Sequence, residues 1–133
     1  MRETEVAFET QTGLSFDEAV ERCRQALARE GFGVLTEIDV KATLKKKLDV
    51  DREPYLILGA CHPPSAHRAL SAAPEVGVLL PCNVTVSVEK GGTVVRAMNP
   101  AGAMGILKNP VLTEVAAEVG AALKRVVQEV GVV

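Results

Sequence analysis

Apolar residues recur every three or four positions in two long segments of the chain, a spacing that predicts amphipathic helices. The first segment starts with the capping box Ser15–Glu18, in which each side chain accepts a hydrogen bond from the other residue's backbone amide, and it ends at Gly31. Its apolar stripe includes Cys23, which we therefore expect in the core. The second segment starts at the cap residue Asn109 and contains Gly120. A glycine inside a helix lowers its stability, so we expect a neighbouring backbone to lie close there.

Two shorter helices are predicted between these segments. Asp39 is suited to cap a helix whose apolar residues stand at every fourth position from Val40 to Leu48, with lysines on the outer face. The two prolines that follow His62 open the other helix, because proline fits the first helical turn, and this helix stops at Pro74.

Continuous or alternating apolar runs predict the strands. The continuous run Tyr55–Cys61 is typical of an interior strand covered on both faces. The alternating run Asn83–Val88 is followed by Lys90-Gly91-Gly92, in which two glycines supply the positive φ of a tight hairpin turn. The predicted strands cover Thr4–Glu9, Phe32–Ile38, Tyr55–Cys61, Val76–Leu80, Asn83–Val88 and Thr93–Met98.

The remaining segment, Asn99–Asn109, is predicted to be a long loop, and long loops in small domains often bind ligands. The elements then alternate as β-α-β-α-β-α and end as β-β-β-α, without internal repeats or a glycine-rich phosphate loop. This order predicts a single α+β domain over residues 1–133, with hairpins near its end.

Composition narrows the classes of function. The chain has 133 residues, of which 47% are hydrophobic, so it can build a core and is not a disordered protein. Its 15 basic and 17 acidic residues leave a net charge of −2, and only 3% of residues are aromatic. A nucleic-acid partner is not expected, because both the positive charge and the stacking platforms are missing.

The sequence also indicates a compartment. The acidic start of the chain lacks the apolar run of a secretory signal, and no apolar stretch reaches the roughly 20 residues that span a bilayer. Three cysteines without a CxxC pair fit a reducing environment. We therefore expect a cytoplasmic protein with no membrane partner.

Three blocks of sequence resemble one known family. Residues Gly31–Val40, Tyr55–Ala66 and Gly77–Val84 are similar to the signature blocks of the family called domain of unknown function 302. The resemblance implies an antiparallel sheet covered by helices on one face, in a two-layer, TATA-binding-protein-like α+β architecture, and frequently a dimer. It implies no activity or cofactor. The chain departs from the family pattern at His62, where asparagine is usual, and at Asn99, where aspartate is usual.

Soft side chains suggest the candidate chemistry. Cys61, His62, His67 and Cys82 include thiol and imidazole groups of the kind that bind Zn²⁺ or Cu⁺, but their spacing is not that of structural zinc sites. The plainer interpretation makes the cysteines small buried hydrophobic residues. In a third interpretation Cys61 is a nucleophile whose thiolate is favoured by the helix N-terminus that follows it, and a histidine acts as the base.

Two further features carry weaker hypotheses. The lysines at positions 41 and 45–47, near Glu37 and Asp39, suit an anionic ligand or a solvated helix face. Met98 and Met104, with Ile106, are predicted either to close over an apolar ligand or to cover the end of the core.

These observations lead to one hypothesis and one alternative. We expect a non-enzymatic cytoplasmic binding or interaction module, a homodimer with a small-ligand pocket between sheet and helices. The predicted ligand-binding residues are Cys61, Cys82, Met98 and Met104. The alternative is a metal-binding or thiol-redox protein that uses Cys61, His62 and Cys82. A purely structural dimer is the third class.

Overall fold

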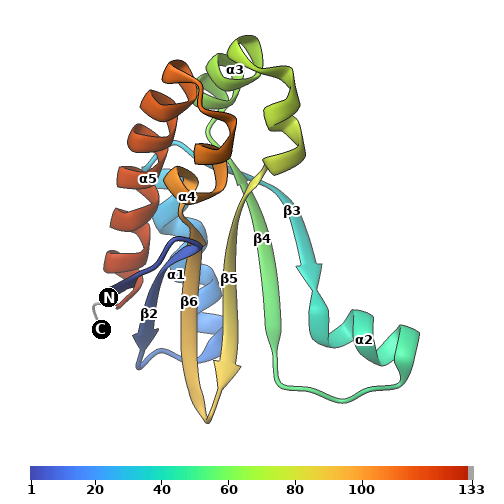
Figure 1. Cartoon of the computed structure of the whole chain (residues 1–133). Coiled ribbons are helices and arrows are strands. Elements are labelled where there is room, and N and C mark those ends of the chain that lie inside the picture. Colours follow the sequence, from blue (N-terminus) through green and yellow to red (C-terminus); the bar gives the residue numbers. More distant parts are fainter. Residues whose placement is uncertain (132–133) are drawn as a thin grey trace.

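The computed structural model describes residues 1–131 and contains one antiparallel sheet flanked by helices (Figure 1). The strands are β1 (Arg2–Glu3), β2 (Ala7–Thr12), β3 (Gly33–Asp39), β4 (Tyr55–Cys61), β5 (Cys82–Glu89) and β6 (Gly92–Met98). The helices are α1 (Phe16–Arg29), α2 (Val40–Leu48), α3 (Pro63–Ala72), α4 (Pro100–Met104) and α5 (Pro110–Gly131), with 3-10 turns η1 (Pro74–Leu79) and η2 (Gly105–Leu107). Among the described residues the strand order is β1-β2-β6-β5-β4-β3.

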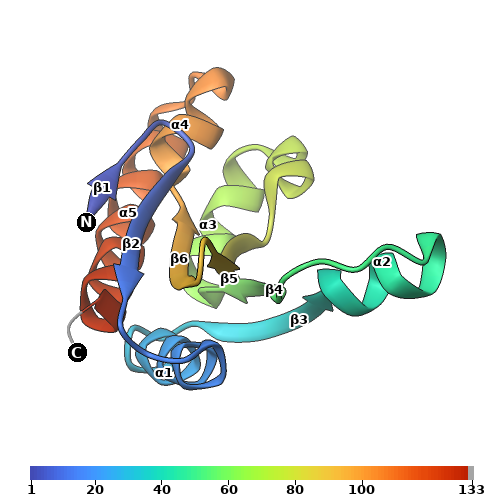
Figure 2. The ribbon, with the colours of Figure 1, turned by 90° about the horizontal axis from the view of Figure 1, so that it is seen from below.

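The sheet curls around α1 and α5, which pack on one of its faces (Figure 2). Val84 and Val86 of β5 and Val95 of β6 point to that face and belong to the same buried cluster as Leu27 of α1 and Leu123 of α5. Alternation along the strands puts every second side chain into this cluster. The prediction of an α+β fold with helices on one face of an antiparallel sheet is confirmed.

The local signals for helix ends hold in the structure. The hydroxyl of Ser15 accepts a hydrogen bond from the backbone amide of Glu18 at 3.2 Å, as the capping box predicts. Gly31 follows α1 with a φ of 84°, a left-handed conformation that glycine adopts without steric cost. Asn109 caps α5 and Cys23 is fully buried, so these expectations are confirmed too.

One predicted strand is wrong. Val76–Leu80 lies within and just after the 3-10 turn η1, and Val76 is buried while Val78 is 88% exposed. A short apolar run does not distinguish a strand from a helical turn by periodicity, and here Pro74 starts the turn. The position beside β4 in the sheet is taken by β5, which begins two residues after Leu80.

Four other expectations need adjustment. The first strand is a hairpin, because the Thr4 hydroxyl accepts a hydrogen bond from the Ala7 amide and turns the chain between β1 and β2. The segment 99–109 is largely helical, since Asn99 caps α4. Strand β4 is an interior strand, but helices cover only one of its faces. In the β5–β6 turn the positive φ values fall on Lys90 and Gly91.

Helix α2 and the segment that follows it project away from the body as an arm (Figures 1 and 2). Asp39 caps the helix as predicted, accepting a hydrogen bond from the amide of Ala42 at 2.9 Å. No residue of α2 is buried, and Leu48 is 67% exposed. The regularly spaced apolar residues of α2 are therefore not buried in the core of the described chain. No helix within residues 1–131 combines the length and apolar character needed to cross a membrane.

The expected close approach at Gly120 is not found. A Cβ added there would lie 3.6 Å from the ring of Pro100 and 3.9 Å from Phe8, which is ordinary van der Waals contact. The close approach occurs instead at Gly102, where an added Cβ would lie 1.9 Å from the carbonyl oxygen of Glu5. Helix α4 thus packs directly on the backbone that links β1 to β2.

We predict that Gly120→Ala raises the free energy of unfolding by about 1 kcal/mol, because alanine loses less backbone entropy in a helix and its methyl group fits. Urea denaturation of both proteins measures the difference. Gly102→Ala is the matched control and is expected to be strongly destabilising. A loss of stability in Gly120→Ala would contradict the contacts described here.

Candidate functional site

A cavity of about 290 Å³ lies where the end of β4 and the start of β5 meet α3 and α5. Four lining residues carry a thiol, imidazole or hydroxyl group: Cys61, His62, Ser65 and Cys82. All the others are apolar, so the wall offers contact area and few hydrogen bonds. They are Phe32, Leu35, Ala60, Ala66, Ala69, Leu70, Leu80, Pro81, Met104, Val115 and Val119.

The cavity brings together three of the four predicted ligand-binding residues. Cys61, Cys82 and Met104 line it, and Met104 is only 3% exposed. Met98 does not line it, because it lies at the end of β6 opposite Ala7 and packs against the core. Ile106 is 74% exposed on the turn η2 and also lies outside the cavity wall.

The two cysteines come from neighbouring strands. Cys82 pairs with Ala60 across the β4–β5 ladder, so Cys61 is one residue out of register with it. Burial, and to a lesser extent the nearby Cys61, raises the pKa of the Cys82 thiol to about 11. Cys61 is half-buried and Cys82 is buried, so Cys82 forms the deeper part of the wall.

His62 is fixed by contacts on both sides of its ring. Its Nδ1 lies 2.8 Å from the hydroxyl of Ser65, and the ring packs against Phe32 with centroids 5.4 Å apart. A Cβ on Gly31 would lie 3.3 Å from the imidazole, so the glycine leaves space for the ring. His67 is exposed on α3. Within the described residues no hydrogen bond joins either histidine to Cys61, and the nucleophile–base pair is not formed.

The alternative metal set is not assembled. Within residues 1–131 no group of three or more His, Cys, Asp or Glu side chains is placed to hold a metal ion. His62 instead has its Nδ1 within hydrogen-bond distance of the Ser65 hydroxyl and its ring against Phe32. Cys61 and Cys82 alone are left as thiol ligands near one another.

The charged residues noted in the sequence are paired or solvated. Lys45 contacts Asp49 at 2.8 Å and Asp51 at 3.3 Å, and Lys41, Lys46 and Lys47 are exposed on the arm. Glu37 pairs with Arg24 of α1. None of these lysines lines the cavity beside Cys61, which fits the solvated-face interpretation.

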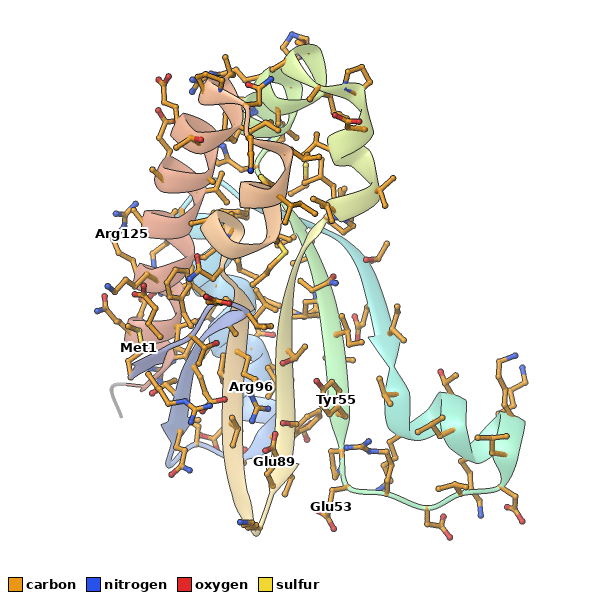
Figure 3. All side chains as sticks on the ribbon, viewed as in Figure 1. Met1, Glu53, Tyr55, Glu89, Arg96 and Arg125 are labelled. Atoms are coloured by element: carbon orange, nitrogen blue, oxygen red, sulfur yellow. The ribbon has the colours of Figure 1, made fainter. Side chains whose placement is uncertain are left out.

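A larger, charged hollow of about 410 Å³ lies on the sheet face away from α1 and α5. Arg96 at its centre donates hydrogen bonds to Glu9 at 2.6 Å and to Glu89 at 2.5 and 3.0 Å, and Figure 3 labels Arg96 and Glu89. Arg96 and the Ser87 hydroxyl lower the pKa of Glu89 to about 2. Because these charges already satisfy one another, the hollow is an ion-pair network that links β2, β6 and β5.

Several lining residues were not anticipated as site residues. Phe32 precedes β3, and Val115 and Val119 lie on α5, far from Cys61 in sequence. In the sequence these residues are recognisable only as part of an apolar stripe. Such a stripe looks the same whether its residues pack in the core or line a cavity.

Comparisons with known proteins place the chain among relatives of similar shape. The family model described as "Domain of unknown function DUF302" matches residues 8–130. A crystal structure of an uncharacterized conserved DUF302 protein from Bacillus stearothermophilus is 31% identical in sequence, covering 92% of this chain and 96% of that chain, with a TM-score of 0.87. A search of the curated proteins found no match.

Stability is expected to fall above pH 9 because of the buried thiols. Burial raises the pKa of Cys82 to about 11, and that of Cys23 to about 12, from an ordinary 9.0. Between pH 9 and 11 the unfolded chain therefore binds fewer protons than the folded one, and the stability present below pH 9 is progressively lost.

Relative to Cys82→Ala, the wild-type protein should lose about 2 kcal/mol more unfolding free energy between pH 9 and 11. Urea titrations at fixed pH values measure this, and titration of other groups cancels in the comparison. Equal pH slopes for the two proteins would contradict a buried, protonated Cys82.

Proposed function

The chain belongs to the DUF302 family, and we propose that it is a non-enzymatic cytoplasmic binding module that takes a small, mainly apolar molecule into the cavity beside Cys61 and Cys82. The observation that carries this proposal is the composition of the wall. Eleven apolar residues surround a space large enough for a small ligand, and concave apolar sites with few polar groups are the usual form of ligand pockets.

The thiols act in this proposal as part of the apolar wall. Residues directly opposite on antiparallel strands share a face, and the partner opposite Cys82 is Ala60. Cys61 is offset by one position, which disfavours a cross-strand disulfide with Cys82. A thiol such as Cys82, whose pKa is raised to about 11, stays protonated at neutral pH and behaves as a hydrophobic group.

Filling the cavity tests the proposal. Ala66 lines it from α3, and Ala66→Phe should lower the affinity for the neutral dye N-phenyl-1-naphthylamine at least about tenfold, because the ring occupies the ligand's space. Dye fluorescence measures the binding. Ala28→Phe, on the exposed side of α1, is the control and should bind as the wild type does. Equal binding by all three proteins, or none by the wild type, would refute the pocket.

The homodimer is part of the same proposal and is supported by the arm. Strand β3 is an edge of the sheet and α2 leaves from its end, with Leu35 67%, Ile38 48% and Leu48 67% exposed. Exposed apolar side chains on an edge strand and on the arm that continues it favour an interaction surface, and two-fold dimers are the commonest assembly. Leu35 also lines the cavity, so a second copy on this edge would lie next to the ligand.

We expect the wild-type protein to sediment as a dimer in the micromolar range and Leu48→Lys to sediment as a monomer, because a charge would be buried in the interface. Analytical ultracentrifugation gives both masses. Val78→Lys alters an equally apolar side chain that is 88% exposed on η1, and it should leave the dimer intact. A monomeric wild type, or a dimeric Leu48→Lys, would argue against the arm as the interface.

A further inference from the structure

A second hollow, of about 220 Å³, adjoins the apolar cavity. Both are lined by Phe32, His62, Ser65 and Val119, so these side chains form a wall shared by the two spaces. The second hollow differs in character, because charged side chains from the residue after α1 and from α5 line it in addition. An apolar space thus meets a polar space at the His62–Ser65 hydrogen bond.

The charges in the second hollow are Glu30, Glu118 and Arg125. Arg125 donates hydrogen bonds to both carboxylate oxygens of Glu30, at 2.8 to 3.2 Å, and this pairing lowers the pKa of Glu30. Arg68 of α3 donates to Oε2 of Glu118 at 2.9 Å. Among the described residues, the one guanidinium that lines the hollow is therefore already occupied by a carboxylate, and the second carboxylate is paired with Arg68, which lies outside the wall.

This arrangement of charges favours an uncharged head group over an anionic one. A carboxylate or phosphate would have to compete with Glu30 for Arg125 and would lie near the carboxylate of Glu118, so the described wall offers an anion no free cationic partner. A hydroxyl group can donate a hydrogen bond to Oε1 of Glu118, which accepts none from the described residues, without breaking an ion pair.

We propose that the two hollows form one site for an uncharged amphiphile, with its alkyl chain in the cavity beside Cys61 and its hydroxyl group past His62 against Glu118. The cavity of about 290 Å³ corresponds to roughly ten water-sized units of ~30 Å³, which is enough for a chain of about eight carbons. This inference rests on the proposed function, because it assigns the ligand class of the same pocket.

The test compares two ligands of equal chain length on the full chain. Isothermal titration calorimetry should show octan-1-ol binding the wild type at least about tenfold more tightly than octanoate. Glu30→Gln removes one carboxylate and frees Arg125, so octanoate should bind it at least about fivefold more tightly than it binds the wild type, with little change for octan-1-ol.

Glu129→Gln is the matched control, because Glu129 pairs with Arg29 in another contact between α1 and α5 and its loss changes the net charge equally. It should bind both ligands as the wild type does. Glu118→Gln, on the exposed side of α5, is a second variant that should also tighten octanoate binding and should weaken octan-1-ol binding.

The outcomes separate this inference from the proposed function. If octanoate binds the wild type as tightly as octan-1-ol, or if Glu30→Gln and Glu129→Gln bind octanoate equally, the head group is not in the second hollow and the inference is overturned. Dye binding that is lost in Ala66→Phe would then still support the apolar pocket. If the dye does not bind the wild type, the pocket proposal fails with it.

Discussion

The packing of α1 and α5 onto one face of the sheet is the contact on which the other features depend. Val84, Val86 and Val95 are fully buried beneath these helices, and burial of each such side chain contributes about 1.5–3 kcal/mol. The sheet, which twists by itself, lies against the helix pair on this face (Figure 2). The same packing also brings the polar sides of α1 and α5 together, where Arg125 meets Glu30.

The cavity arises where this packing ends. Helix α3 follows β4 directly, since Pro63 starts the helix at the end of the strand, and α3 contacts α5 without lying flat on the sheet. The side chains available there are small, including Ala66 and Ala69, and they do not fill the space under Val115. The space is open to solvent at Leu35 and Leu70, so its apolar wall contacts water when no ligand is bound, and burial of that surface would favour an apolar ligand.

The sequence was informative wherever a local interaction decides the structure. The Ser15 cap and the left-handed Gly31 depend on neighbouring residues alone, and each was recognisable from residue type and spacing. The tight turn between β5 and β6 was recognisable too, although its positive φ values fall on Lys90 and Gly91 and not on the two glycines. The strand expected at Val76–Leu80 failed for the opposite reason. A short apolar run can form either a strand or a helical turn. In this chain β5 takes the place beside β4, and that pairing depends on contacts between segments far apart in the sequence.

The candidate site shows the same division. Residue chemistry alone singled out Cys61, Cys82 and Met104, because thiols and thioethers are few in this chain, and the sequence itself determined the α+β class and the starts of α1, α2, α3 and α5. Only the tertiary structure decided that Met98 stays outside the cavity and that Val119 enters its wall. The reason is physical: a strand or helix determines which face a side chain is on, but what that face meets depends on segments up to a hundred residues away, as for Glu30 and Arg125.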